Sequence, residues 1–153
     1  MSRAFVKETD AELPPPPERP VSAHPNYVTT HGLAATEAEL ARLDAAHAAA
    51  VRAGDREAIA LTQRDQRYWT ARRASAQVVG DPPADGRVHF GATVTLERGD
   101  GRRQTFRIVG EDEADPTEGR VSYVSPLAQA LMGKEVGDTA MVAGHEVEIT
   151  ALD

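Results

Sequence analysis

The sequence predicts an α+β protein in which an N-terminal antiparallel two-helix coiled coil precedes a small antiparallel sheet with one short helix. Three observations support this prediction. Residues 33–53 repeat seam positions at the 3.5-residue period of a coiled coil. A glycine follows at position 54, and a second helical segment begins directly after it. From residue 87 onward, the pattern changes to short strands separated by glycine turns.

The composition excludes several classes of chemistry. The 153 residues are 41% apolar but only 5% aromatic, so the expected core is small and aliphatic. The absence of cysteine excludes a disulfide framework, a zinc–thiolate site and cysteine catalysis. No apolar run approaches the ~18 residues of a membrane helix, and no apolar signal segment opens the chain. We therefore expect a cytoplasmic protein without a membrane partner.

Charge is distributed unevenly along the chain. The net charge of −7 argues against a general duplex-DNA binder, yet residues 52–73 hold six arginines and only three acids. A basic segment in an acidic chain suggests a contact with an anionic partner, and an arginine-rich helix face in water has the same composition. The arginines are Arg52, Arg56, Arg64, Arg67, Arg72 and Arg73.

Residues 1–30 have the composition of a proline-rich flexible tail. Pro14 to Pro17 and Pro20 favour polyproline II, which makes no internal hydrogen bonds and buries little surface. We expect residues 1–25 to be mobile or to lie over the protein surface. A proline-rich peptide ligand is a sharper alternative.

A coiled-coil hairpin is expected at residues 31–79. Dense alanine in the first helix favours helix formation and permits close packing. Gly54 ends this helix, and Asp55 has the side chain of an N-cap for the next one. The expected seam of the first helix consists of Leu33, Thr36, Leu40, Leu43, His47 and Ala50.

The second helix is expected at residues 56–79 and must run antiparallel to the first, because the turn is short. The register places Leu61 near His47. It also brings Arg72 near Glu37, which predicts an ion pair between them. The expected seam positions are Leu61, Asp65, Tyr68 or Trp69, Arg72, Ala76 and Val79.

Residues 80–86 are expected to be a linker, since their prolines and glycines will not continue a helix. Residues 87–153 then form the sheet domain. Ser125 and Pro126 open its short helix as cap and first helical residue, and Gly133 ends it. Strands are expected at residues 87–90, 92–98, 104–109, 120–124, 139–142 and 145–151.

Two groups of acidic residues are candidates for cation binding. Asp55 and Glu57 lie at the expected hairpin tip, where two carboxylates could share a magnesium ion with other ligands. The alternative is structural, with Asp55 as a helix cap and Glu57 favoured by the helix dipole. The acidic run at residues 111–115 lacks the spacing of a calcium loop, so a solvated loop or a contact for a partner's arginines fits it better.

Four strings follow one another in the second half of the chain and occupy most of residues 86–140. They are GRVHFGATVT from residue 86, FRIVGEDEAD from residue 106, VSPLAQALMGKE from residue 124 and VGD from residue 136. In this order they resemble the Gre-type transcript cleavage factors, GreA and GreB. AQVV at residues 76–79 and the Gly54–Asp55 pair fit as well, so the resemblance covers roughly residues 29–153.

The resemblance implies an accessory factor of bacterial RNA polymerase, with no catalytic residue or cofactor of its own. The family's C-terminal domain is FKBP-like and docks on the rim of the secondary channel, where the segment matching Ser125 and Pro126 contacts the β′ subunit. The coiled coil enters the channel, and the acidic tip matching Asp55 helps hold a magnesium ion in the polymerase active site. The polymerase then cuts backtracked RNA. A monomer suits such an arm.

Two departures from the family pattern bear on the mechanism. The family tip places its acids three residues apart, whereas Glu57 comes one residue early and Ala58 takes its place, a shift that rotates a helical side chain by ~100°. Each arm is also roughly eight to ten residues shorter than in GreA, which removes ~12–15 Å of reach. The short-armed nucleoside diphosphate kinase regulators resemble Gre factors and occupy the same channel without reaching the metal.

Several hypotheses therefore stand. The factor either stimulates transcript cleavage or occupies the channel without doing so. Its basic arm could face acidic channel walls or the RNA 3′ end, and Tyr68 and Trp69 either stack on a base or pack against the first helix. A peptidyl-prolyl isomerase is a different class, for which Phe90, Phe106 and Tyr123 offer few aromatic rings. An adaptor unconnected to transcription is a third class.

Overall fold

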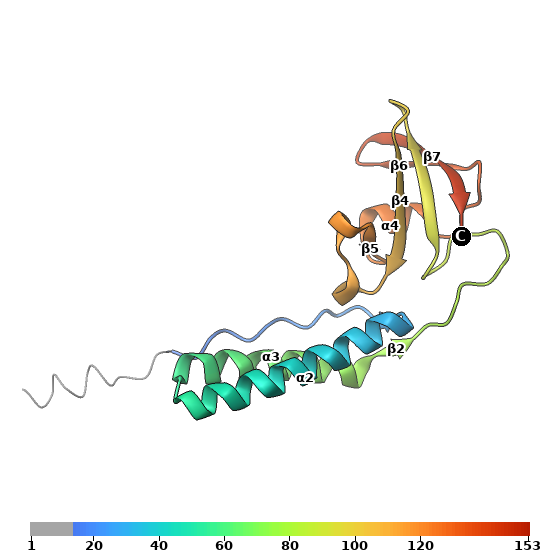
Figure 1. The fold of residues 1–153 in the computed structure, drawn as a ribbon. Coiled ribbons are helices and arrows are strands. Elements are labelled where there is room, and N and C mark those ends of the chain that lie inside the picture. The colour runs from blue at the N-terminus through green and yellow to red at the C-terminus, as the bar shows by residue number, and fades with distance from the viewer. Residues whose placement is uncertain (1–13) are drawn as a thin grey trace, which may run out of the picture.

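The computed structural model describes residues 14–153 and consists of a long two-helix hairpin and a curled sheet domain (Figure 1). The predicted α+β class is confirmed. The helices are α2 (Thr30–Ala53), α3 (Arg56–Ser75) and α4 (Pro126–Leu131). The strands are β1 (Tyr27–Val28), β2 (Gln77–Val78), β3 (Thr93–Arg98), β4 (Arg103–Val109), β5 (Arg120–Ser122), β6 (Thr139–Val142) and β7 (His145–Leu152).

Local signals at the ends of the helices set the hairpin. Thr29 caps α2 by accepting a hydrogen bond from the Gly32 amide. Gly54 ends α2 in the left-handed conformation, at a φ of 66° that glycine adopts without steric cost. Asp55 caps α3, and its Oδ1 accepts from the Ala58 amide at 3.1 Å. The predicted antiparallel turn at positions 54 and 55 is confirmed.

The seam of α3 differs from the expected register by one residue. On α2, Thr36 and Leu43 are buried as expected. On α3, the Thr62 hydroxyl lies 3.1 Å from the His47 ring nitrogen, whereas Leu61 is 37% exposed. Because one residue turns a helical side chain by about 100°, this shift changes which side chains face the partner helix.

The predicted ion pair between Glu37 and Arg72 is wrong for the same reason. Arg73 Nε lies 2.9 Å from Glu37 Oε1, and Arg72 is turned away from Glu37 and buried. The helix also ends at Ser75 rather than at residue 79, because β2 follows and pairs in parallel with β1. In the described part of the chain, no helix has the length and apolar composition needed to cross a membrane.

The segment before α2 packs along the hairpin (Figure 1). Of the two expectations for residues 1–25, the structure has the surface-laid arrangement for residues 14–25, and residues 1–13 lie outside the described residues. A flexible tail up to residue 30 is wrong for its last part. Asn26 is buried, β1 pairs with β2, and Thr30 already begins α2.

The five-stranded sheet has the order β5-β4-β3-β7-β6. Its neighbours are antiparallel except β4 and β5, which are parallel, so the prediction of a wholly antiparallel sheet is wrong at this edge. Two 3₁₀ turns, Glu111–Glu113 and Pro116–Glu118, make the crossover between them. The core packs α4 against the sheet with Val88, Ala92, Val94, Leu96, Ile108, Val121, Ala128, Leu131, Ala140, Val147 and Ile149.

The first expected strand of this domain, residues 87–90, is wrong. Only an isolated bridge between Arg87 and Glu135 forms there, although Val88 and Phe90 are buried. The segment around Glu135, which follows α4, pairs with residue 87 at this single bridge and does not form a strand with it. The remaining predicted strands are confirmed to within two residues at each end.

The sheet domain rests on the base of the hairpin through its acidic turn. Asp112 Oδ2 accepts from Arg72 Nε at 2.6 Å. Glu113 accepts from the Thr29 hydroxyl at 2.5 Å and from the Thr29 amide at 3.1 Å. The expectation of a solvated loop is therefore wrong for this turn, because a buried arginine requires a carboxylate and this turn supplies it.

Candidate functional site

The hairpin tip lies at the end of the arm farthest from the sheet domain (Figure 1). It consists of Gly54, Asp55, Arg56 and Glu57, all of which are exposed. One oxygen of Asp55 caps α3, and its other oxygen makes no hydrogen bond within residues 14–153. The tip is thus a narrow polar end with carboxylates available to an outside partner.

The tip alone does not make a metal site. Among residues 14–153, no three histidine, aspartate or glutamate side chains are grouped so that they could hold a metal ion. A magnesium ion usually takes one or two protein carboxylates and completes its shell with water or other oxygen donors. The free oxygen of Asp55 fits such a shared role, in which most ligands come from elsewhere.

Ser125 and Pro126 lie in the sheet domain, at the start of α4. The Ser125 hydroxyl accepts from the Ala128 amide at 3.2 Å, so serine acts as the predicted cap, and Pro126 is exposed at the first helical position. Tyr123, two residues earlier, donates a hydrogen bond to the carbonyl of Pro25. This segment therefore adjoins the base of the arm, and the length of the hairpin separates it from Asp55.

Four of the six arginines of the basic arm are paired within the chain. Arg64 lies 3.0 Å from Asp65, Arg67 binds Glu18, Arg72 binds Asp112 and Arg73 binds Glu37. Arg52 and Arg56, beside the tip, are exposed and make no ion pair with another described residue. The two arginines without an ion pair in the described chain therefore lie at the tip end of the arm, next to the carboxylates of Asp55 and Glu57.

Tyr68 and Trp69 have a neighbour that neither sequence interpretation included. Their rings pack edge to face with centroids 5.2 Å apart, and the Arg19 guanidinium lies 4.0 Å from the Tyr68 centroid. Burial first, and then the hydrogen bond that the Tyr68 hydroxyl donates to Asp112, raise the pKa of Tyr68 to about 12. Arg19, from the segment before α2, thus lies over the aromatic part of α3.

The junction between the arm and the sheet domain was missed by sequence reasoning. Arg72 is 2% exposed and contacts Asp112, while its Nη2 donates to the Asn26 side chain at 2.8 Å. Asn26 in turn donates to the Arg72 carbonyl at 2.8 Å. An arginine on an apolar seam position was the available signal, since such a residue needs a buried partner.

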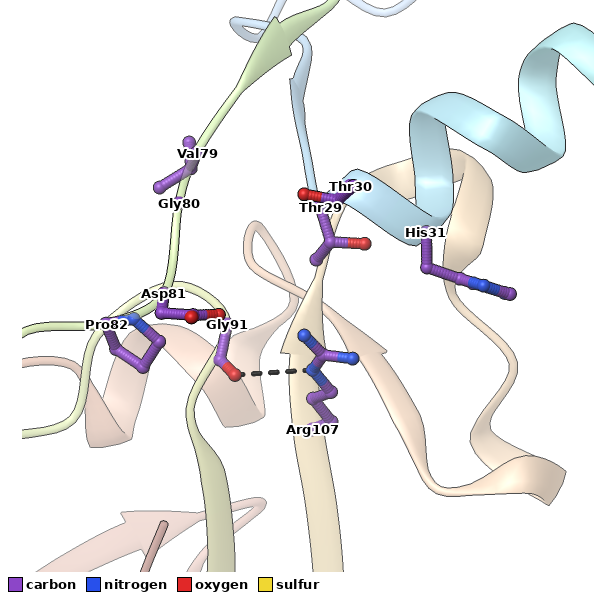
Figure 2. Close-up of a pocket in the computed structure, with 9 residues that line it drawn as sticks. All are labelled: Thr29, Thr30, His31, Val79, Gly80, Asp81, Pro82, Gly91 and Arg107. Atoms are coloured by element: carbon purple, nitrogen blue, oxygen red, sulfur yellow. Dashed lines mark hydrogen bonds between the residues drawn. The ribbon is translucent and has the colours of Figure 1, made fainter.

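A cavity of about 240 Å³ also lies at this junction, where α2 begins (Figure 2). Arg107 projects into it from β4 and donates from Nε to the Gly91 carbonyl at 3.3 Å. Its other walls come from the start of α2 and from the linker. It lies at the opposite end of α2 from the tip and contains none of the predicted site residues. The lining residues are Thr29, Thr30, His31, Val79, Gly80, Asp81, Pro82, Gly91 and Arg107.

Comparison with known proteins gives consistent matches. Residues 83–152 match the family model "Transcription elongation factor, GreA/GreB, C-term". GreA of Desulfovibrio desulfuricans is 37% identical over 134 residues, which cover 75% of this chain and 83% of that protein. GreA of Ralstonia nicotianae and GreB of Pseudomonas aeruginosa are each 48% identical, over 52% and 50% of this chain. The chain spans about half the length of these two relatives, 54% and 46%.

Two solved structures also match this chain. GreA factor homolog 1 (Gfh1) of Thermus thermophilus is 19% identical, with a TM-score of 0.41 over 85% of this chain and 99% of that one. The GreA/GreB elongation factor of Nitrosomonas europaea is 20% identical, with a TM-score of 0.38 over 83% and 98%.

Proposed function

Because the chain belongs to the GreA/GreB family of transcription elongation factors, we propose that it binds bacterial RNA polymerase and modulates elongation from the secondary channel. The observation that carries this proposal is the exposed tip around Asp55, held at the end of a two-helix arm away from the sheet domain. At 1.5 Å per residue, the 20 residues of α3 span about 30 Å. We propose a monomer that acts in the bacterial cytoplasm.

The docking segment in this proposal is the start of α4. Pro126 is exposed, and Ser125 is fixed by its own capping hydrogen bond, so the pair presents a rigid corner to the rim of the channel on the β′ subunit. The junction at Arg72 and Asp112 ties that corner to the base of the arm. A rigid junction would fix the direction of the arm relative to the sheet domain, so that docking of this domain also orients the tip.

Asp55 is the residue proposed to act at the polymerase active site. A magnesium ion shared with that site would supply Lewis-acid activation of the scissile phosphate. Asp55 would contribute one carboxylate oxygen, while its other oxygen keeps α3 capped. Glu57 follows in the first turn of α3, and Arg52 and Arg56 place positive charge beside the tip for the channel walls or the RNA 3′ end.

A second version has a specific structural basis. The arm is short, and Glu57 is displaced by one residue from the family pattern, so the protein would occupy the channel and exclude other factors without stimulating cleavage. Transcript cleavage in backtracked elongation complexes separates the two versions. Asp55→Asn is the informative variant, because asparagine caps a helix as well as aspartate does but carries no charge. Loss of cleavage with retained polymerase binding supports the first version.

A proline-isomerase activity is disfavoured by the aromatic cluster of the sheet domain. Tyr27 of β1 packs against Phe90 and Tyr123, with ring centroids 6.2 Å and 5.3 Å away. Two of the three rings that could line a proline pocket, Phe90 and Tyr123, are thus packed against Tyr27 of the chain itself. An isomerisation assay on a model peptide is expected to give no rate above background.

A further inference from the structure

Residues 14–25, here called the strap, run along α3 (Figure 1). Their inner end is anchored next to Asn26, which is buried and exchanges two 2.8 Å hydrogen bonds with Arg72. Ser22 donates to Glu111 at 3.0 Å near the same end. The inner end of the strap is therefore fixed to the junction of arm and sheet domain.

The outer part of the strap is attached much more weakly. Glu18 accepts from Arg67 Nε at 3.0 Å, and these side chains are 63% and 55% exposed. Arg19 lies over Tyr68 and has its Nη1 3.4 Å from Asp65. Within the described chain, no backbone hydrogen bond joins residues 14–24 to the arm. Side-chain contacts alone hold this part: the Glu18–Arg67 pair is exposed, and the Arg19 contacts are only partly buried. Salt screens ion pairs at the surface.

The composition of the strap suits reversible attachment. Pro14 to Pro17 and Pro20 favour the extended polyproline II form, which has no backbone hydrogen bonds of its own. A segment that is already extended when free loses little conformational entropy on docking. It can therefore leave and return without refolding.

The strap presents the same chemical groups that a single-stranded nucleic acid would present to this face. Glu18 places a carboxylate on Arg67, where a phosphate would accept the same guanidinium hydrogen bonds. Arg19 places a planar group over Tyr68, 5.7 Å from the Trp69 centroid, where a base would stack. Both ligands cannot occupy these positions together.

We propose that the strap is an intramolecular competitor of single-stranded RNA for the α3 face formed by Arg64, Arg67, Tyr68 and Trp69, and that it must lift before this face binds RNA. The choice of RNA rests on the proposed function, since the arm would enter a channel that holds the RNA 3′ end. Competition by the strap is a property of the isolated protein and can be measured without polymerase.

The first test measures binding of a labelled single-stranded oligouridylate to the full chain by fluorescence anisotropy at low salt. Glu18→Gln is expected to tighten binding about two- to fivefold, as the loss of one exposed ion pair predicts. Glu146→Gln makes the same charge change on an exposed position of β7 and serves as the matched control. Equal affinities for these two variants would overturn the proposal.

Arg19→Gln gives a sharper discrimination, because the two accounts predict opposite signs. Removal of a positive charge weakens RNA binding if only overall charge matters. It tightens binding if Arg19 blocks the aromatic face. Weaker binding by Arg19→Gln than by the wild type would contradict the competitor role.

Trp69 is the only tryptophan and reports the position of the strap directly. Acrylamide quenching of its fluorescence is expected to increase in Glu18→Gln and in Arg19→Gln, and to increase with salt in the wild type. Unchanged quenching under all three conditions would show that the strap does not lift. These measurements contain no polymerase, so a failure of polymerase binding would contradict the proposed function and leave them unaffected.

Discussion

Arg72 of α3 and Asp112 of the sheet domain form an ion pair with 2.6 Å between Arg72 Nε and Asp112 Oδ2. The two side chains are 2% and 13% exposed. A charge withdrawn from water is tolerated only when it is paired and hydrogen-bonded, and Asn26 supplies a further acceptor for Arg72. This pair joins the arm to the domain that carries Ser125 and Pro126.

Arg72→Ala is expected to destabilise the protein by about 3–5 kcal/mol, because it leaves the Asp112 carboxylate without its positively charged partner. Urea unfolding followed by circular dichroism measures this loss. Arg73→Ala, one residue away, breaks an exposed pair with Glu37 and should stay within about 0.5 kcal/mol of wild type. Similar losses for the two variants would contradict the assigned burial.

Gly110→Ala tests the close approach of the sheet domain to β1. A Cβ at Gly110 would lie 2.3 Å from the Tyr27 carbonyl oxygen, which is backbone and cannot rotate away. Overpacking of this kind costs about 1–3 kcal/mol, measurable as a lower urea midpoint. Gly80→Ala is the control, because no atom lies within 4 Å of the added carbon. An unaltered midpoint for Gly110→Ala would mean that the two segments lie farther apart.

The stability of the protein should fall as the pH rises from 10 to 12. The folded state raises the pKa of Tyr68 from 10.0 to about 12, first through burial and then through the hydrogen bond to Asp112. The unfolded chain ionises at the lower pH, so the contribution of Tyr68 is fully present below pH 10 and is lost through this window. Absorbance titration at the tyrosinate band should show the latest-ionising group disappearing in Tyr68→Phe. If the latest-ionising group were still present in Tyr68→Phe, the raised pKa would belong to another tyrosine.

Leu43 and Leu61 test the register of the hairpin. Leu43 is 2% exposed, and its replacement by alanine should cost about 2–5 kcal/mol. Leu61 is 37% exposed, so Leu61→Ala should cost much less, although its spacing fits the seam. Urea midpoints of both variants decide between this register and the one that the spacing alone predicts. Equal losses of stability in Leu43→Ala and Leu61→Ala would favour the register that the spacing alone predicts.

Local signals predicted the parts of the fold that depend on neighbouring residues. Gly54, Asp55 and Ser125 act through the backbone within a few positions, so a turn and two caps could be assigned from the sequence. The parallel β4–β5 pair and the β1–β2 pair join distant segments, and no local pattern specifies them.

In the candidate site too, features set by neighbouring residues were predicted and contacts between distant segments were not. The exposed tip was predicted because a hairpin places its turn at its end. The ion pairs of the basic arm were not predicted, because the partners of Arg67 and Arg72 lie 49 and 40 residues away in sequence. The acidic turn was expected to be solvated or to contact a partner, and the proline-rich segment to be mobile or to lie over the surface. Neither pattern specified the contacts of these segments with α3.

The position of the tip in a complex with RNA polymerase tests the central claim most directly. The chain has no cysteine, so Arg56→Cys creates a single thiol beside Asp55 for an iron chelate that generates hydroxyl radicals. Asp100→Cys, in the turn after β3, labels the sheet domain as a control. The label at position 56 is predicted to cut polymerase segments that line the secondary channel, and the label at position 100 to cut only outer surfaces. Cuts confined to outer surfaces from both positions, with the factor bound, would contradict insertion of the arm.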